Sequence, residues 1–377
     1  MKDHGPPLSR RHMLSLTAGA IPALSCAPGL AVAPPSGLDA IARSRGLRFG
    51  TAVSPTHLDD PAFAQLIVRE CSVLTAENNF KWKYLEAKEG QRNPAKALRV
   101  LRFASRHRMS PRGHTFVWNQ DDRVPGWLIA NEAALAQKGG APLIALMNDH
   151  ARYLATTFPQ IESWDCVNEA FVVQSGQLKN SIYTRILGMG FFDLAFQLMA
   201  QYAPHAQRVY NGNMSWEQNP DHRDAVLRVL EQALKRGVPV NAIGIQSHLG
   251  NTLGRGRDER AWNRFLAELD AMGMTVLITE LDCADRHLSD QEPARRDAEI
   301  AAFVKGYLDI TLSHRNVSQI ICWGLSDRYS NLNRDSYPTR SRRPDGLPMR
   351  GNPFDDALRP KPFYDAIATA LAACPVR

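Results

Sequence analysis

The sequence predicts a single (β/α)8 barrel of the TIM type, in the α/β class. Eight short runs rich in apolar and β-branched residues alternate along the chain with amphipathic stretches of helical periodicity. Strands that are apolar almost throughout and alternate with helices are typical of a parallel sheet, and eight such units favour a closed barrel over an open, doubly wound sheet. Because no linker, repeat or low-complexity segment divides this region, we expect one domain.

Each of the eight units pairs one strand with the helix that follows it. In chain order, strands and helices are expected at 47–53 and 61–70, 71–76 and 94–108, 109–118 and 141–158, 163–168 and 191–202, 207–211 and 220–236, 242–246 and 260–272, 275–279 and 292–313, and 319–324 and 361–373. The strands are assigned from their short apolar runs and the helices from their one-sided apolar faces.

The composition is that of an ordinary globular protein. The chain has 377 residues, of which 44% are hydrophobic and 22% charged, with 25 Gly and 24 Pro. These fractions exclude a collagen-like, disordered or coiled-coil chain. The formal net charge of +7 is spread along the sequence without a Lys/Arg run, so no nucleic-acid partner is expected.

The N-terminus has the pattern of an export signal. Arg10 and Arg11 form a twin-arginine pair, and an uncharged stretch follows them from Met13 to Leu38. Glycines and prolines interrupt that stretch too often for a membrane span, and residues 31–33 resemble a cleavage site. We therefore expect residues 1–33 to be a signal of the type that exports folded proteins, and residues 34–377 to be a periplasmic or secreted catalytic domain. An uncleaved or lipid-modified anchor at Cys26 is the alternative.

The cysteines do not point to a metal. Five of the six remain once a signal is removed, and no CxxC spacing occurs. An odd number leaves at least one free thiol, and Cys71, Cys166 and Cys322 lie in apolar runs where we expect them to be buried. No metal, cofactor or further membrane span is expected.

Polar residues recur at the ends of six predicted strands. They include Glu77 with Asn78, His114, Asn168 with Glu169, Gln246 with His248, Glu280 with Asp282, and Trp323. Such groups have little use in an apolar core, whereas barrel enzymes place their catalytic residues at the carboxyl ends of strands.

Glu169 and Glu280 are the strongest catalytic candidates. They end the fourth and seventh strands, and a retaining glycosidase needs two carboxyls about 5–5.5 Å apart. Neighbouring amides and an imidazole, at Asn168, Gln246 and His248, are suited to giving the two carboxyls different pKa values.

The sequence blocks around these residues resemble glycoside hydrolase family 10, whose main members are endo-1,4-β-xylanases. The resemblance covers roughly residues 40–372 and rests on segments 75–82, 112–115, 164–169, 244–248, 278–282 and 323–327, with Lys361-Pro362 near the end.

The resemblance implies a role for each matching residue. Glu169 is expected to be the acid/base and Glu280 the nucleophile. The expected substrate-binding residues are Glu77, Asn78 and Lys81 on the non-reducing side, His114, Trp118 and Asn168 at the cleaved sugar, Gln246 and His248 beside the catalytic pair, and Trp323 against the sugar ring. Asp282 is expected behind His248. Trp82 and Trp164 are expected in the core instead of at the sugar.

Two positions depart from the family pattern. Asn213 stands where an aromatic residue usually stacks on the leaving-group sugar, and we expect Trp216 to be able to replace it. Asn331 stands where a tryptophan commonly walls the cleaved sugar. The loss of such a contact costs about 1–3 kcal/mol of sugar binding.

The loop after the eighth strand is rich in arginine. Residues 328–350 hold six arginines against two aspartates. Either this is a solvated basic loop, or one or two arginines pair with uronic-acid branches of a xylan, which suits the bidentate guanidinium.

The expected function is therefore that of a monomeric, retaining endo-1,4-β-xylanase acting on xylan, including xylan decorated with glucuronic acid. A β-glucan, cello-oligosaccharide or aryl-β-glycoside hydrolase on the same barrel, and a non-catalytic carbohydrate-binding relative, are the alternatives. Both glutamates argue against the last, because binding sugar does not need two carboxyls with their polar neighbours. No metalloprotease, Walker, nucleophile-elbow or dinucleotide motif occurs.

Overall fold

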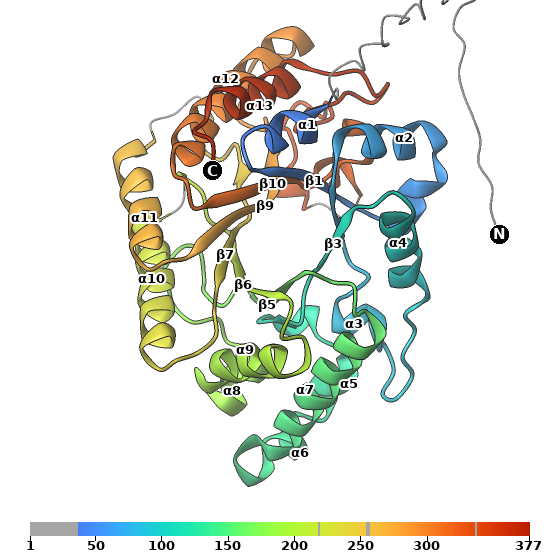
Figure 1. The fold of residues 1–377 in the computed structure, drawn as a ribbon, viewed down its shortest axis with the longest axis vertical. Helices are drawn as coiled ribbons and strands as arrows, with labels where there is room; N and C mark the ends of the chain where they lie inside the picture. The colour runs from blue at the N-terminus through green and yellow to red at the C-terminus, as the bar shows by residue number, and fades with distance from the viewer. Residues whose placement is uncertain (1–36, 218, 254–256, 336–337) are drawn as a thin grey trace, which may run out of the picture. The chain divides into compact units, whose positions relative to one another are not determined.

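The computed structural model describes residues 37–217, 219–253, 257–335 and 338–377. The expected export signal at 1–33, including Cys26, lies outside the described residues. The described part of the chain forms a ring of parallel strands enclosed by helices (Figure 1).

Eight strands close into a parallel barrel, as predicted. Its order is β1-β2-β3-β5-β6-β7-β9-β10, and pairing of β10 with β1 completes the ring. The bounds are β1 (Arg48–Val53), β2 (Val73–Ala76), β3 (Ser110–Gly113), β5 (Ser163–Asn168), β6 (Gln207–Gly212), β7 (Ala242–Ile245), β9 (Thr275–Cys283) and β10 (Val317–Cys322). Two short strands, β4 (Val117–Trp118) and β8 (His248–Leu249), extend the barrel at the carboxyl ends by pairing with β5 and β9.

The eight predicted helices are all present on the outside of the ring (Figure 1). They are α2 (Pro61–Glu70), α4 (Ala95–Arg106), α7 (Gln137–Thr157), α9 (Gly190–Tyr202), α10 (Pro220–Lys235), α11 (Glu259–Ala271), α12 (Pro293–Ser313) and α13 (Pro362–Ala373). Shorter helices that the sequence pattern did not indicate are α1 (Leu38–Arg43), α3 (Trp82–Leu85), α5 (Gly126–Ala130), α6 (Glu132–Leu135) and α8 (Ile182–Leu187). Five 3-10 turns add η1 (Pro55–Asp59), η2 (Asp121–Arg123), η3 (Asp327–Tyr329), η4 (Asn331–Asn333) and η5 (Thr339–Ser341).

Local chemistry explains where several helices begin. Asp60 caps α2 by accepting from the backbone N–H groups of Ala62 and Phe63, and Pro61 occupies the first turn, where no N–H partner is needed. In α7 the backbone leaves helical geometry from Lys138 to Gly140, so its regular part starts at the predicted position.

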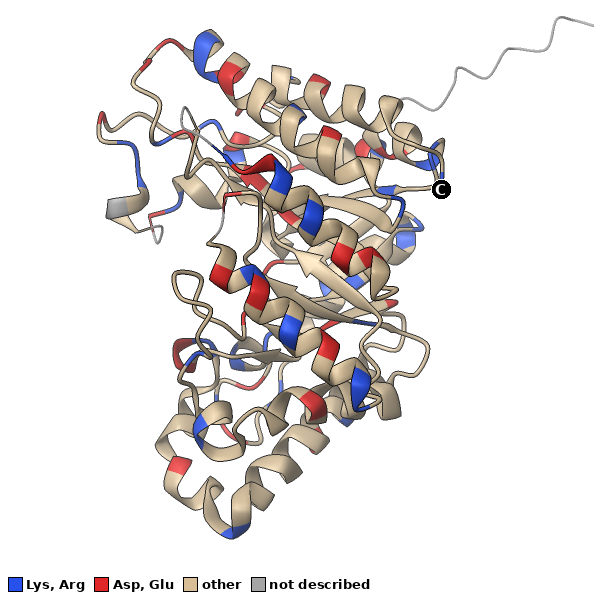
Figure 2. Ribbon diagram, turned by 90° about the vertical axis from the view of Figure 1, so that its left-hand side faces the viewer, with Lys and Arg blue, Asp and Glu red and all other residues tan. Residues whose placement is uncertain are grey.

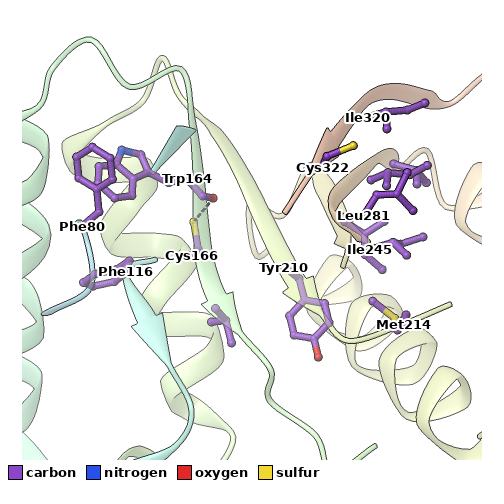
Figure 3. Close-up of a cluster of buried hydrophobic side chains, with 14 of the residues drawn as sticks. Phe80, Phe116, Trp164, Cys166, Tyr210, Met214, Ile245, Leu281, Ile320 and Cys322 are labelled. Carbon is purple, nitrogen blue, oxygen red and sulfur yellow. Dashed lines mark hydrogen bonds between the residues drawn. The ribbon is translucent and has the colours of Figure 1, made fainter. Parts of the chain in front are cut away.

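The core lies between the strands and the surrounding helices (Figure 3). Trp82 and Trp164 are both buried in it, as predicted. Gly113 of β3 packs so closely on Trp164 that an added Cβ would lie 2.1 Å from the indole, which explains the glycine just before His114. Cys71, Cys166, Cys283, Cys322 and Cys374 are buried free thiols, which confirms the prediction for the three that were singled out.

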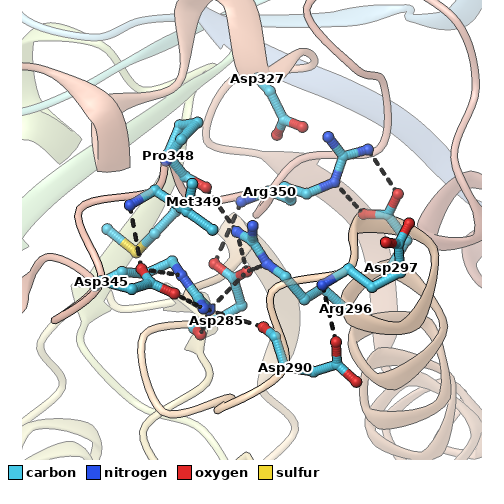
Figure 4. A network of polar contacts seen from close by, with 12 residues as sticks. Asp285, Asp290, Arg296, Asp297, Asp327, Asp345, Pro348, Met349 and Arg350 are labelled. Carbon is cyan, nitrogen blue, oxygen red and sulfur yellow. Dashed lines mark hydrogen bonds and ion pairs between the residues drawn. The ribbon is translucent and has the colours of Figure 1, made fainter.

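Arginines of the loop after β10 are paired with carboxylates, so among the described residues the expectation of a solvated basic loop is wrong for Arg343 and Arg350. Arg343 is buried and contacts the carboxylates of Asp285 and Asp345, while Arg350 makes two contacts of 2.6 and 2.7 Å with Asp297 of α12 (Figure 4). Since buried charges are stable only when paired, these ion pairs fix the loop to the barrel.

The outer surface mixes both signs of charge. On the side that carries α10 and α11, Lys and Arg alternate with Asp and Glu along the helices (Figure 2). Among the described helices, none is long and apolar enough to cross a membrane.

Candidate active site

The carboxyl ends of the barrel strands surround a small polar cavity of about 190 Å³. It is lined by Glu77, Asn78, Lys81, His114, Trp118, Arg123, Asn168, Glu169, His248, Glu280, Trp323, Asn331 and Arg334. The site residues predicted from the sequence line this cavity, except for Gln246 and Asp282. Gln246 contacts Glu169 and Asp282 contacts His248, and both partners line the cavity. The structure therefore brings the whole predicted set together.

Glu280 of β9 is held by side chains from two other strands, β6 and β8. The side-chain N–H of Asn211 donates to Oε1 over 2.9 Å, and His248 Nε2 lies 3.1 Å from Oε2. The other ring nitrogen of His248 lies 2.9 Å from Asp282, which places Asp282 behind His248 as predicted. Although burial disfavours the charge, Asp282 and Glu280 together raise the pKa of His248 well above its ordinary value, so the imidazolium is retained beside Glu280.

Glu169 meets a different environment at the end of β5. Gln246 donates to Oε1 over 3.0 Å, whereas Oε2 accepts from Trp118 over 3.3 Å and from Lys179 over 2.9 Å. Burial raises the pKa of Glu169, but the Lys179 charge and these hydrogen bonds outweigh burial and lower the pKa to about 2. Its backbone has a φ of 56°, a strained geometry that is common at functional sites.

Asn168 links the two carboxyl environments. Its Oδ1 accepts from Asn211 over 2.8 Å and from Gln246 over 3.4 Å, and these two amides contact Glu280 and Glu169 respectively. This leaves the Nδ2 group of Asn168 buried without a protein partner, so it is available to donate to a bound hydroxyl. Thr279 donates to Asn211 Oδ1 over 2.7 Å, which fixes the orientation of that amide.

One end of the cavity is formed by the loop after β2. Lys81 donates to Asn78 over 2.8 Å and lies 4.4 Å from the Trp118 ring centre. Burial lowers the pKa of Lys81 to about 8. Glu77 is paired with Arg334 at 2.8 Å, and burial raises the pKa of Glu77 despite this cation. Asn78, Lys81 and Glu77 offer both donors and acceptors to sugar hydroxyls.

His114 and Trp323 form another wall of the cavity. His114 Nδ1 lies 2.8 Å from Asp165, which also pairs with the buried Arg112. The His114 ring packs edge-on against Trp118 and Trp323, with centroids 5.8 and 5.4 Å apart. This packing leaves an aromatic face next to the polar groups, which suits a sugar ring.

Comparison with known proteins identifies the family. Residues 37–370 match the sequence model of Glycosyl hydrolase family 10. The chain belongs to this family. It is therefore a glycoside hydrolase, and the resemblance inferred from the sequence blocks is confirmed.

Individual relatives agree with this membership. The chain is 26% identical over 315 residues to endo-1,4-beta-xylanase A of Caldicellulosiruptor saccharolyticus, covering 78% of this chain and 86% of the relative. It is 30% identical over 297 residues to endo-1,4-beta-xylanase 2 of Claviceps purpurea, covering 78% and 83%. Xylanase 10B from Thermotoga petrophila RKU-1, solved in complex with xylobiose, superposes with a TM-score of 0.78 at 25% identity, covering 89% of this chain and 97% of that one.

One expected compensation for a family departure is wrong. Trp216 is 2% exposed and packs against Phe303 and Tyr307, with Arg257 over its ring at 4.3 Å. Because this side chain is enclosed in the core, it does not replace the aromatic residue missing at Asn213. Asn331, by contrast, does line the cavity at the position where a family tryptophan is common.

Four residues of the site were not among the individually named candidates from the sequence: Lys179, Asn211, Arg123 and Arg334, the last of which was counted only with the loop arginines. Asn211 lies near the carboxyl end of β6, so the same rule of polar residues at strand ends could have indicated it. Lys179 and Arg123 lie outside the barrel strands, and no sequence pattern marks them. Among the described residues, no group of three or more His, Cys, Asp or Glu side chains is placed to hold a metal ion.

Proposed function

We propose that this family 10 hydrolase cleaves internal β-1,4 bonds of xylan with retention, using Glu280 as nucleophile and Glu169 as acid/base. The observation that carries the proposal is the amide network that joins the two carboxyls through Asn168, Asn211 and Gln246. The two carboxyls face a single cavity, and each lies beside a different cationic partner: His248 for Glu280 and Lys179 for Glu169. The relatives named as endo-1,4-beta-xylanases support xylan as the substrate.

The reaction takes two steps. In the first, a Glu280 oxygen attacks the anomeric carbon, the glycosidic C–O bond breaks, and Glu169 gives its proton to the leaving oxygen. In the second, Glu169 takes a proton from water, whose oxygen attacks the same carbon and releases Glu280. Two inversions give net retention.

The cavity residues divide between binding and positioning. We assign Glu77, Asn78 and Lys81 to hydroxyls on the non-reducing side, His114, Trp118 and Trp323 to the walls of the cleaved sugar, and the buried Asn168 Nδ2 to its 2-hydroxyl. Gln246 and His248 orient the carboxyls that they contact, and Asp282 orients His248.

Product analysis on glucuronoxylan tests this function. We expect short xylo-oligosaccharides from the parent protein and almost none from Glu280→Gln. Equal product from both proteins would contradict the nucleophile, and no product from a folded parent would contradict the substrate.

A second candidate substrate is a β-glucan or cello-oligosaccharide. Asn331 favours it, because the loss of a tryptophan wall leaves room for the hydroxymethyl group that distinguishes glucose from xylose. Relative rates on xylotetraose and cellotetraose decide between them, and Asn331→Trp should lower the rate on cellotetraose more.

A finer proposal is that the protein binds the acidic branches of xylan. Arg334 lines the cavity but is paired with Glu77. Arg328, Arg343 and Arg350 pair with Asp60, Asp285 and Asp297 outside the loop, and Arg342 donates to the backbone carbonyl of Asp335 within it. A second cavity, of about 540 Å³, shares Asn78 with the catalytic cavity and is lined by Lys96, Arg99 and Arg102 as well as the exposed Tyr84. We infer that a uronate on a distal sugar binds there.

The ratio of cleavage rates on glucuronoxylan and linear xylan tests this inference. In a Lys96→Ala/Arg102→Ala variant we expect the ratio to fall by about 2- to 30-fold, since exposed charge pairs contribute about 0.2–1 kcal/mol each. An unchanged ratio would contradict the second cavity as a uronate site.

We also propose export through the twin-arginine signal at 1–33. Fusion of residues 1–36 to a folded reporter should place the reporter outside the cytoplasm, and Arg10→Lys/Arg11→Lys should retain it inside. Release of the reporter from membranes in both the parent fusion and Cys26→Ser would contradict a lipid anchor.

The oligomeric state is a separate prediction. We expect a monomer, and light scattering would measure its mass in solution.

A further inference from the structure

Lys179 is the unexpected partner of the acid/base. The chain after β5 folds back on itself, with Phe171 bridged to Leu178 and the Lys179 backbone N–H donating to Ala170 over 2.9 Å. This turn returns Lys179 to the end of the strand that carries Glu169. Its ammonium donates to Glu169 Oε2 over 2.9 Å and to Gln120 Oε1 over 3.2 Å.

The contacts of Glu169 favour its ionised form. Lys179 and the Trp118 indole can only donate hydrogen bonds, and both point to Oε2. A proton on that oxygen would face two donors, so the ammonium must withdraw before Oε2 can carry the proton. Acid catalysis in the first step nevertheless requires a protonated Glu169.

Other titratable groups near Glu169 do not have this contact. Lys81 is hydrogen-bonded to Asn78, and the His248 nitrogens contact Glu280 and Asp282. The negative charge of Glu280 acts against ionisation of Glu169.

Three further groups complete the surroundings of Glu169. His222 of α10 is neutral near pH 7, because burial and Lys179 lower its pKa to about 4. Tyr210 of β6 is neutral because burial raises its pKa. Arg123 lies over the Trp118 ring, 4.8 Å from its centre. Among these groups, Lys179 is the cation that directly contacts Glu169.

We propose that Lys179 is a positioning residue that holds Glu169 ionised in the free enzyme and thereby sets the upper pH limit of activity. The ammonium withdraws toward Gln120 when Glu169 takes up the proton, and it returns when Glu169 must accept a proton from water. The inference rests on the proposed acid/base role of Glu169. It concerns one ion pair and leaves the substrate open.

The first test is the pH profile of kcat/KM on xylotetraose. Lys179→Met removes the positive charge, so the pH at which kcat/KM falls on the alkaline side (the upper limb of the profile) should rise by at least one unit. At a pH above the parent's fall, the variant should therefore keep about ten times more of its maximal kcat/KM than the parent does. Lys179→Arg should keep the original limb. Lys235→Met, which removes an exposed lysine paired with Glu231 on α10, is the matched control and should not move it.

A substrate with a dinitrophenyl leaving group sharpens this test. Such a leaving group needs no proton, so the limb shift seen on xylotetraose should be absent on dinitrophenyl β-xylobioside. Superimposable profiles of Lys179→Met and the parent on xylotetraose, or the same shift in Lys235→Met, would overturn the proposal.

A titration independent of activity separates this inference from the proposed function. In protein labelled with 13C at the glutamate carboxyls, the Glu169 resonance, assigned with Glu169→Gln, should titrate at higher pH in Lys179→Met than in the parent. An unchanged midpoint in a variant with the parent's circular dichroism spectrum would overturn the role of Lys179, even if xylan is cleaved. A raised midpoint supports it even if xylan is not the substrate.

Discussion

Glu169 follows β5 and Glu280 lies in β9 of the same barrel, yet their surroundings differ in origin. The side chain of Glu280 is 7% exposed and is held by Asn211 of β6 and His248 of β8. The side chain of Glu169 is 19% exposed, and its charged partner Lys179 comes from a loop. The barrel thus fixes one carboxyl, while a loop adjusts the other.

This difference matches what each carboxyl has to do. A nucleophile keeps the same charge until it attacks, so a rigid set of donors and a retained imidazolium suit Glu280. An acid/base residue must gain and lose a proton in every cycle, so a partner on a flexible side chain suits Glu169. In this site a loop residue controls the pKa of one carboxyl, and strand residues control the geometry of the other.

The largest loss of activity should follow substitution of Glu280, whose partners lie on strands. Glu280→Gln is nearly isosteric and keeps the contact with Asn211, but it removes the nucleophile. We expect kcat to fall by at least about 10⁴-fold on every glycoside, whatever its leaving group. Steady-state rates on xylotetraose and on dinitrophenyl β-xylobioside measure this. A fall on only one of the two would contradict this division of roles.

A smaller loss of activity should follow substitution of Glu169, whose charged partner lies on a loop. Glu169→Gln should lower kcat on xylotetraose by about 10²–10⁴-fold, because general acid catalysis is lost. The rate of the first step on the dinitrophenyl substrate should be nearly unchanged, because this leaving group needs no proton. A burst of dinitrophenol should therefore precede a slow steady state. Absence of that burst, in a variant that still binds xylobiose, would argue against Glu169 as the acid/base.

The imidazolium of His248 should make stability depend on pH. Its folded-state pKa is raised, so its stabilising contribution is fully present below its ordinary pKa of about 6.5 and is lost as the pH rises through the folded value. Asp282→Asn should therefore lower the free energy of unfolding by about 1–3 kcal/mol at pH 5, and by less at pH 9. Urea unfolding at both pH values measures this, and an equal or larger loss at pH 9 would contradict a charged His248.

The smallest effect should come from Trp118. Trp118→Phe keeps an aromatic wall but removes the 3.3 Å hydrogen bond to Glu169 Oε2. A long bond from a neutral donor contributes about 0.5–1.5 kcal/mol, so we expect kcat/KM to fall by no more than about tenfold. The upper pH limb should move less than in Lys179→Met. A larger shift in Trp118→Phe would assign pKa control to the indole instead of the lysine.

The barrel and most of the site could be predicted from the sequence, because both depend on local patterns. Apolar strands alternate with amphipathic helices, and catalytic groups follow directly where strands end. Glu169, His248 and Glu280 were therefore placed correctly without knowledge of any contact.

Features that depend on where a side chain points could not be predicted. The Ser175-Gly176 dipeptide indicates a turn before Lys179, but no sequence pattern shows that this turn returns Lys179 to Glu169. Trp216 was expected near the sugar, but its burial against Phe303 depends on packing between distant helices and loops. The loop arginines were misjudged because their acidic partners, such as Asp285 and Asp297, lie far away in the sequence.

The central claim is that Glu280 forms the covalent intermediate, and trapping tests it most directly. The protein is treated with a 2-fluoro β-xylobioside that carries a dinitrophenyl leaving group, digested, and mapped by mass spectrometry. We expect one fluoroxylobiosyl group per molecule, on the peptide that contains Glu280 and on that residue. An adduct on Glu169 or on any other side chain would contradict the account.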